Sequence, residues 1–373
     1  MDFETLAKKR KQAIADHQAG RLDQAVEAYN DLLEYEGCDD QFEGEVPDTL
    51  ALGQFFSTVH NNLGAIDLRA GRYKPARAAF RNALDLAPGH VEANTNLGLA
   101  HFYSGNPTSA IDCFLRALEV DPSYLTARFS LVKAFNMIGQ HEKAMESLDE
   151  SIAKYPDLAG FHAERAESLV RLGRIDEAKV SAVEAVRLDP QDAKAMATMG
   201  TVHWMTGKLE LAAKAYRSSL TLRPAEPGVH TNLAMVLQKL NQFDQAVESY
   251  KSALAIDPTF ADANGHLAYL YASRNQISGA RKAAAAGLKT KSGDPLMLFV
   301  LGLCDRLEGD LVAAKAQFLS LEPALPSGRL LFELLHELAK VLEATGEADE
   351  AAKYIARADR IKAGLPTVGG AGL

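Results

Sequence analysis

The chain has 373 residues, of which 47% are hydrophobic, 24% charged and only 7% aromatic, which argues against a large aromatic core. Its formal net charge of −9 disfavours the broad basic surface with which proteins bind DNA or RNA. No apolar run approaches the roughly 20 residues that span a membrane, and Cys38, Cys113 and Cys304 form no C-x-x-C pair, so we expect reduced thiols and no membrane insertion.

The N-terminal stretch "MDFETLAKKRKQAIADH" lacks the apolar segment of a secretory signal. Together with the isolated cysteines, this predicts a cytoplasmic protein. The basic run at residues 8–11 is interpreted as a solvated helical turn rather than an anchor for lipid or nucleic acid. The acidic stretch "EGCDDQFEGEVPD" follows, and residues 37–56 are predicted to be an insertion that leads into a helix extension.

Beyond the insertion, proline returns at a fixed interval of 34 residues, at Pro88, Pro122, Pro156, Pro190, Pro224 and Pro258. Proline cannot donate a hydrogen bond within a helix, and it disfavours helical geometry in the residue before it. Its regular spacing therefore predicts regular helix ends. A period of this length is typical of repeat architectures.

Each unit also has a helix-ending residue and a small residue at fixed positions. We number each unit 1–34, with the proline at register 32. Register 15 then carries a residue that accepts the left-handed conformation at a helix end: Gly71, Gly105, Gly139, Gly173, Gly207, Asn241 and Asn275. Register 20 carries Ala76, Ala110, Ala144, Ala178, Ala212, Ala246 and Ala280. Each unit is therefore predicted to be a helix, a turn, a second helix and a proline stop, a pair that must stack on its neighbours.

This pattern resembles the tetratricopeptide repeat. Apolar residues occupy registers 7, 8, 11, 20, 24 and 27 before the proline, as in "HNNLGAIDLRAGRYKPARAAFRNALDLAP" at residues 60–88. The pattern recurs in register through residues 57–294 and, with variations at both ends, covers nearly the whole chain. The resemblance implies an all-α fold, a right-handed α-solenoid of about ten stacked helix–turn–helix units, whose first helices line a concave groove.

The repeat pattern sets the expected boundaries. Residues 57–328 are predicted to form eight consecutive 34-residue units, with Gly98 at register 8 allowing close helix packing. Residues 1–36 are interpreted as an N-terminal capping unit, 329–363 as a degenerate C-terminal capping unit, and 364–373 as a flexible tail. In the first unit Asp16 stands at a normally apolar position, so we expect its face to meet water.

The sequence has no motif for phosphate binding, a nucleophile elbow, a zinc site or a dithiol. The single "ELLH" at residues 333–336 lacks the second copy that a di-iron site needs. We interpret the histidines at registers 4 and 11 as half-buried packing residues: His60, His162 and His230, and His101 and His203. We therefore predict a protein that is not an enzyme and has no cofactor or metal.

Partner-binding residues are expected on the concave face. At 100° per residue, registers 4, 7, 8 and 11 share the core-facing side of the first helix, whereas registers 2, 5, 9, 12 and 13 point away from it. By the resemblance, these registers and register 6 line the groove. The predicted peptide-binding residues are Asn62, Asn96, Leu99, Phe102, Tyr103, Phe129, Lys133, Met137, Arg171, Trp204, Met205, Met235 and Tyr269. Aromatic anchors with adaptable methionines are typical of peptide-binding surfaces.

Some of these positions have an alternative interpretation. Phe102 and Trp204, at register 12, either line the groove or pack between adjacent repeats. Phe299 shares register 5 with Phe129 and is expected on the same surface. At register 13 the groove is favoured, for Tyr103, Met137 and Met205.

Two ligand-binding modes of similar repeat proteins fit poorly. Receptors for chaperone tails hold a terminal carboxylate with Lys, Arg and Asn at registers 2, 5, 6 and 9, but here register 5 lacks lysine and register 9 lacks asparagine. The asparagine ladder of protein O-GlcNAc transferases, at register 6, is represented only by Asn62, Asn96 and Asn232. Contacts of that kind are therefore expected only locally.

We expect a non-catalytic scaffold or adaptor that binds an apolar peptide or helix of a partner protein in the groove. One alternative is a homo-oligomeric scaffold, in which a second copy occupies the groove. Another is a targeting subunit for a glycosyl- or sulfotransferase-type enzyme encoded on another chain. RNA reading by helical repeats is disfavoured by the acidic balance and by the 34-residue period.

Overall fold

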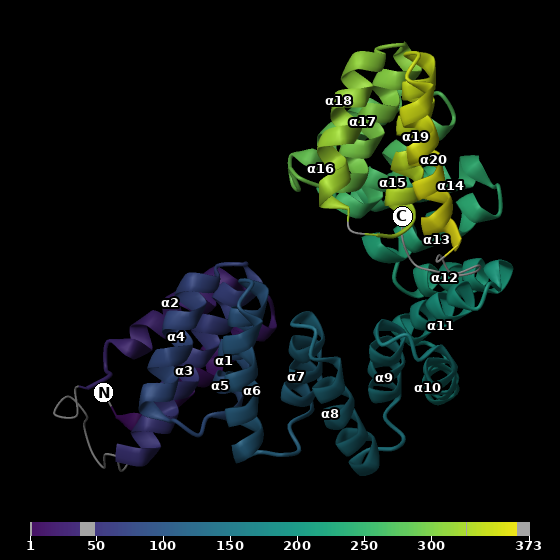
Figure 1. Ribbon diagram of the computed structural model, residues 1–373. Helices are drawn as coiled ribbons and strands as arrows, with labels where there is room; N and C mark the ends of the chain where they lie inside the picture. The colour runs from purple at the N-terminus through teal and green to yellow at the C-terminus, as the bar shows by residue number, and fades with distance from the viewer. Residues whose placement is uncertain (1, 38–48, 326, 364–373) are drawn as a thin grey trace. The chain divides into compact units, whose positions relative to one another are not determined.

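The computed structural model describes residues 2–37, 49–325 and 327–363, whose regular structure is entirely helical (Figure 1). This confirms the prediction of an all-α fold built from helix–turn–helix units. Cys38, most of the acidic stretch and the predicted tail 364–373 lie outside the described residues. The chain divides into two compact units, Met1–Pro156 and Asp157–Leu373. In the part of the chain that is described, no helix is both long and apolar enough to cross a membrane.

Unit 1 consists of four helix pairs, each of which packs on the next. The helices are α1 (Phe3–Gln18), α2 (Leu22–Leu33), α3 (Thr49–Arg69), α4 (Tyr73–Leu86), α5 (Val91–Tyr103), α6 (Pro107–Val120), α7 (Leu125–Met137) and α8 (His141–Lys154). Helix α3 begins eight residues before the first 34-residue unit.

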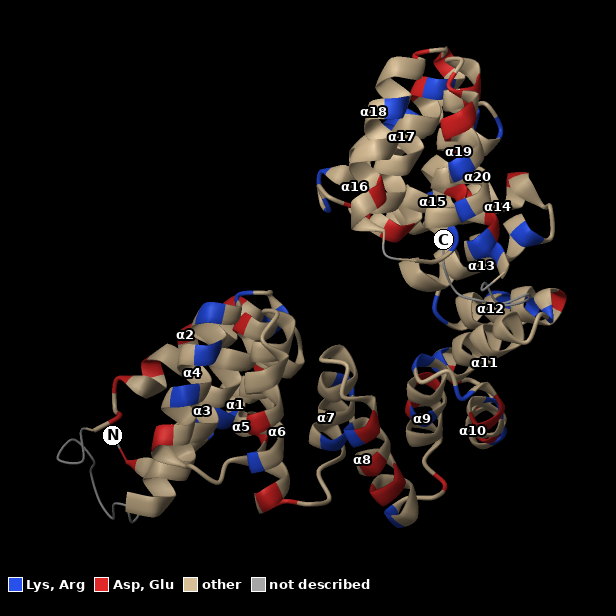
Figure 2. Cartoon of the chain, viewed as in Figure 1, with Lys and Arg blue, Asp and Glu red and all other residues tan. Residues whose placement is uncertain are grey.

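Unit 2 continues the same pattern with six pairs. The helices are α9 (Ala159–Arg171), α10 (Ile175–Leu188), α11 (Ala193–Met205), α12 (Leu209–Leu222), α13 (Pro227–Lys239), α14 (Phe243–Ile256), α15 (Ala261–Ser273), α16 (Ile277–Leu288), α17 (Pro295–Glu308), α18 (Leu311–Leu321), α19 (Arg329–Ala344) and α20 (Ala348–Ala363). A short 3-10 helix, η2 (Glu322–Ala324), follows α18. In both units Lys and Arg are interspersed with Asp and Glu along the helices (Figure 2).

The turn inside each pair contains one left-handed residue at the predicted position. Its φ is +71° for Gly71 and +79° for Gly105, and it is +60° and +56° for Asn241 and Asn275. The amide after Gly71 donates to the carbonyl of Asp67 at 2.9 Å, which closes the end of α3. The prediction that register 15 ends the first helix is confirmed.

Close approach of the two helices depends on a glycine at register 8 that faces an aromatic ring at register 24. A Cβ added at this glycine would lie 2.5–2.7 Å from the ring in the pairs Gly64–Phe80, Gly98–Phe114, Gly200–Tyr216 and Gly302–Phe318. These four rings are completely buried. The predicted role of Gly98 in close helix packing is therefore confirmed.

In four units a polar side chain at register 4 ties the first helix to the loop before it. Its nitrogen lies within hydrogen-bonding distance of the carbonyl oxygen of the proline six residues earlier, at 3.1, 2.7, 2.9 and 3.1 Å for Asn94, Arg128, His230 and Asn264. These bonds satisfy a carbonyl near a helix end, which would otherwise lack a donor. His230 therefore does more than pack in the core, because its ring also holds the loop before α13 to that helix.

Asp16 does not meet water, and that expectation was wrong. Its side chain is only 12% exposed, because Arg21 Nε and Nη2 lie 2.9 and 2.5 Å from its Oδ1. Gln12 Nε2 lies 3.2 Å from both carboxylate oxygens. The hydrogen bonds from Arg21, followed by that from Gln12, hold the pKa of Asp16 below its ordinary value. A polar residue at a core register is therefore satisfied locally rather than exposed.

Gly98→Ala is expected to lower stability, although alanine is the better helix former. Its Cβ would lie 2.5 Å from the buried ring of Phe114. We expect a loss of about 1–3 kcal/mol, measured as a lower urea midpoint followed by circular dichroism. Gly89→Ala is the matched control and should leave the midpoint unchanged, because its Cβ meets nothing within 4 Å. An unchanged midpoint for Gly98→Ala would contradict the packing described.

Candidate functional site

The predicted binding residues of unit 1 include two large apolar side chains that are mostly exposed. Tyr103 is 57% exposed and Met137 is 55% exposed. They share register 13, at the ends of α5 and α7, which contact each other. The ring of Tyr103 stacks on that of Tyr73, with centroids 6.4 Å apart. Lys133 is also exposed. Tyr103 and Met137 therefore offer apolar surface that the core of unit 1 leaves accessible.

The other predicted residues of unit 1 are partly buried. Leu99 and Phe102 pack against the core cluster that contains Phe114, which favours packing between repeats for Phe102. Asn96 Nδ2 donates to Asn61 Oδ1 at 2.9 Å, so its amide links neighbouring helices. The remaining members, Asn62 and Phe129, are half-buried.

In unit 2 the predicted aromatic residues lie closer to the core. Trp204, Met235 and Tyr269 are half-buried and pack against its main cluster. Burial raises the pKa of Tyr269 to about 12. Phe299 is only 1% exposed, stacks on Tyr269 and packs against the tilted ring of Phe318. The expectation that Phe299 lines the groove was therefore wrong. Met205 is half-buried.

Unit 2 contains a cavity of about 550 Å³ between the first helices of three successive pairs. Its lining comes from α9, α11, the end of α12 and the first turns of α13: Glu167, Val170, Arg171, Ala193, Lys194, Ala197, Thr198, Thr201, Ser219, Arg223, Glu226, Gly228, Val229 and Asn232. Most of these residues occupy registers 2, 5, 6, 9, 12 and 13, the set expected on the concave face. Arg171 is the member of the predicted site that the cavity includes, and the ladder residue Asn232 lines it too.

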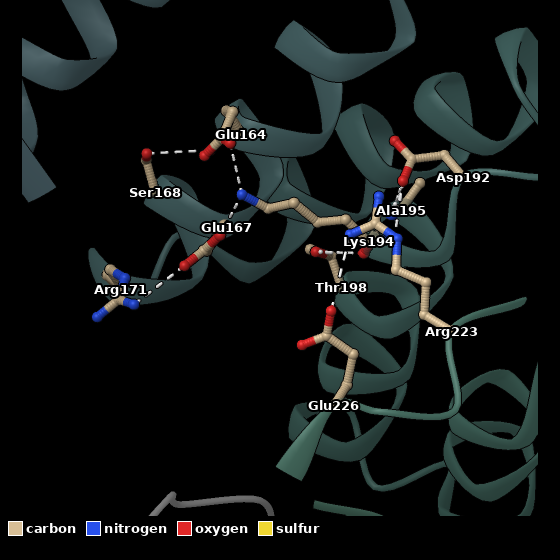
Figure 3. A network of polar contacts seen from close by, with 10 residues as sticks. All are labelled: Glu164, Glu167, Ser168, Arg171, Asp192, Lys194, Ala195, Thr198, Arg223 and Glu226. Carbon is tan, nitrogen blue, oxygen red and sulfur yellow. Dashed lines mark hydrogen bonds and ion pairs between the residues drawn. The ribbon is translucent and has the colours of Figure 1, made fainter. Parts of the chain in front are cut away.

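A chain of alternating charges crosses this cavity (Figure 3). Lys194 Nζ lies 2.6 Å from Glu164 Oε1 and 2.9 Å from Glu167 Oε2. Arg171 Nη2 lies 3.0 Å from Glu167 Oε1. The side chain of Glu164 is only 5% exposed, and that of Lys194 is 31% exposed. The network connects α9 to α11, so it both stabilises the repeat interface and sets the charge of the cavity.

The network favours the ionised forms of Glu167 and Lys194. Burial would raise the pKa of Glu167, but Lys194 and Arg171 together hold it below its ordinary value. Burial would lower the pKa of Lys194, but Glu164 and Glu167 raise it above its ordinary value. A group that transfers protons at neutral pH needs a pKa near 7. These two shifts move both groups away from that value, so their role is electrostatic.

Sequence reasoning missed Lys194 and Arg223. The residues predicted for the groove come from registers 5, 6, 9, 12 and 13, so Lys194, at register 2, is not among them. The signal for Lys194 was present, because it stands at register 2 with glutamates at registers 6 and 9 of the preceding unit. Arg223, at register 31, lies in the loop before α13, where no concave register pointed to it. Its place in the cavity depends on the path of that loop.

Two family models match the sequence. The model of the cilia and flagella-associated protein 70 C-terminal domain matches residues 89–296, more than half of the chain. The tetratricopeptide repeat model matches residues 57–90. No curated protein matches the sequence.

Solved structures with similar folds include the human IFIT1 dimer with PPP-AAAA. It is 16% identical, with a TM-score of 0.56, and the match covers 94% of this chain and 82% of that one. The APC/C hetero-tetramer Cut9–Hcn1 is 15% identical with a TM-score of 0.58, and the match covers 80% of this chain but only 58% of that one. TTC0263, a thermophilic TPR protein of Thermus thermophilus, is 22% identical with a TM-score of 0.45, over 48% of this chain and 98% of that one. The first two likenesses show the fold alone.

Lys194→Met is expected to destabilise unit 2 by about 3–5 kcal/mol, because it leaves the buried Glu164 carboxylate without its cation. Unfolding can be followed by the fluorescence of Trp204, which is the only tryptophan in the sequence and lies in the same helix, α11. The double variant Lys194→Met/Glu164→Gln should recover most of the loss. Lys214→Met, at an exposed position on α12, is the control. Equal losses for Lys194→Met and Lys214→Met would refute this role of the network.

The effect of Lys194→Met should also depend on pH. The pKa of Glu167 is lowered by folding, so its contribution is present above the ordinary carboxylate pKa of about 4.3 and is lost as the pH falls through the folded value. The difference in unfolding free energy between wild type and Lys194→Met should therefore narrow below about pH 4. Urea titrations at neutral and acidic pH measure it. A difference that stays constant over this range would argue against a charge-based contribution.

Proposed function

Because the chain belongs to the family of tetratricopeptide repeat domains represented by the C-terminal domain of cilia and flagella-associated protein 70, we propose that it is a non-catalytic adaptor. It binds an apolar peptide or helical segment of a partner protein on the concave side of its helix pairs. The proposed function is binding without catalysis, and Tyr103 and Met137 provide exposed apolar surface for it.

The observation that carries this proposal is the exposure of Tyr103 and Met137. Each side chain is more than half exposed. Large apolar side chains that gather on one exposed face usually mark an interface with a partner. Tyr103 and Met137 occupy the same register in neighbouring helices, so one extended or helical segment can contact both. Fully burying an apolar side chain of this kind contributes about 1.5–3 kcal/mol. Two such anchors together contribute about 3–6 kcal/mol. A micromolar dissociation constant corresponds to a binding free energy of about 8 kcal/mol, so the two anchors supply a large part of it.

Side chains next to Tyr103 and Met137 also contribute to this surface. Phe102 packs edge-on against the ring of Tyr103, with centroids 5.5 Å apart, and so holds that ring in place. An anchor that is already ordered loses less conformational entropy when a partner covers it. Lys133 is exposed one helical turn before Met137 and adds a cation beside the apolar surface.

The double variant Tyr103→Ser/Met137→Ser should lose the partner proteins that wild type captures, with a drop in affinity of about tenfold or more. Quantitative mass spectrometry of proteins captured on the immobilised full chain provides the measurement. Val180→Ser/Val312→Ser removes two apolar side chains that are 69% and 79% exposed on second helices, and it should change nothing.

Identical capture by the Tyr103/Met137 variant and wild type would contradict the adaptor assignment. Light scattering of both proteins separates binding of a partner from self-association. If wild type is an oligomer that the Tyr103/Met137 variant converts to a monomer, the surface serves a second copy of the chain, and the adaptor proposal fails.

A further inference from the structure

The cavity of unit 2 contains one cation whose partners within the fold leave it largely available. Arg223 is 60% exposed, and its Nη1 lies 3.7 Å from Glu226 Oε1, beyond hydrogen-bonding distance. Within the described residues its guanidinium makes no hydrogen bond. An arginine side chain carries five N–H donors in a planar fork that matches a carboxylate. Figure 3 shows Arg223 on the side of the network opposite to Arg171.

The other charges of the cavity are already paired. Lys194 is held between Glu164 and Glu167, at 2.6 and 2.9 Å, so it is not available to an incoming anion. Arg171 uses one nitrogen on Glu167 and is 51% exposed, which leaves further donors facing solvent. Glu226 is the one carboxylate of the lining without a donor at hydrogen-bonding distance among the described residues. The unused N–H groups of Arg223 and Arg171 nevertheless outnumber the oxygens of this one unpaired carboxylate.

The start of α13 adds to this donor excess. Its N-cap is Glu226, whose side chain makes no capping hydrogen bond, and the first helical residue is Pro227. Glu226, Gly228 and Val229 at the start of α13 line the cavity, so the positive end of the helix dipole lies beside it and favours negative charge, of which Glu226 already supplies one. One turn further, Asn232 lines the cavity with an amide for which the described residues provide no hydrogen-bond partner. Two independent groups, a guanidinium and an amide, thus offer donors to the same space.

The remaining wall of the cavity is small and apolar. Val170, Ala193, Ala197 and Val229 contribute to it. Donor groups beside such a wall suit a short side chain with a methylene stem and a carboxylate end. The volume of about 550 Å³ lies within the range of about 300–1,000 Å³ that ligand pockets occupy.

We propose that the partner segment in this cavity presents an internal aspartate or glutamate, whose carboxylate pairs with Arg223 while Asn232 binds the adjacent peptide group. This inference rests on the proposed adaptor function and specifies one feature of the partner. It differs from capture of a chain-terminal carboxylate by a register-2 lysine, because Lys194 is already neutralised by two glutamates.

The inference can be tested with three pools of degenerate nonapeptides that differ only at the central residue. That residue is fixed as Glu, Gln or Lys, and all other positions are drawn from uncharged residues. Wild-type full-length chain on beads should retain the Glu pool about fivefold over the Gln pool, the size expected for one partly exposed ion pair. Raising the salt concentration should reduce this preference, because it screens the pair.

Arg223→Glu should reverse the order, so that the Lys pool is retained over the Glu pool. Arg187→Glu is the matched control, since Arg187 is 61% exposed and forms a similar i,i+3 pair with Glu184 on α10, away from the cavity. Its preference for the Glu pool should equal that of wild type. Gly228→Leu provides a second variant. A Cβ there meets nothing within 4 Å, so the side chain should occupy the cavity without disturbing the fold and should reduce retention of the Glu pool. Trp204 fluorescence confirms that each variant is folded.

Equal retention of the Glu and Gln pools by wild type would overturn the inference and leave the adaptor proposal standing. An unchanged Glu preference in Arg223→Glu would overturn the assignment to this cavity. If none of the pools is retained, while the Tyr103/Met137 surface also captures no partner, the adaptor proposal itself fails.

Discussion

The contact between the register-8 glycine and the register-24 ring is the constraint on which the helix pairs depend. It brings the axes of two helices so close that a single methyl group would overlap a completely buried ring, as at Gly98 and Phe114. Protein interiors are packed as densely as organic crystals, so such a site cannot relax without cost. Where the register-8 residue is larger than glycine, the register-24 residue is often smaller than an aromatic ring, as in the pair Ala166 and Ala182. The pair Ala234 and Tyr250 departs from this rule and keeps its ring buried.

Fixing the pair in this way determines which positions are left for function. The turn must use a left-handed residue, the core takes registers 8, 20 and 24, and in four units register 4 donates to the preceding proline carbonyl. What remains on the first helix is the outward-facing set of registers. The fold therefore repeats an almost constant set of core and turn positions, while the residues at the outward-facing registers of the first helix vary.

The turn and core positions of each helix pair were predictable from the sequence because they depend on residues close together in the chain. Proline spacing, left-handed glycine or asparagine and a glycine beside a ring are all set within 34 residues. The errors arose where a side chain depends on neighbours in space. Asp16 was expected in water but is covered by Arg21, and Phe299 was expected on the concave face but is buried between two other rings. Lys194 was not predicted because its partners, Glu164 and Glu167, lie in the preceding unit.

The two units present different chemistry on the registers that the core and turn positions leave open. In unit 1 the exposed side chains Tyr103 and Met137 are apolar and carry no charge to be satisfied. In unit 2 the predicted aromatic residues Trp204 and Tyr269 pack against the core, and charged residues line the cavity. Apolar anchors give affinity, whereas fixed charges mainly give specificity and register. A partner that used both surfaces would therefore need an apolar portion and a separate acidic portion. Loss of either contact should weaken binding in a distinguishable way, since only the acidic one responds to salt.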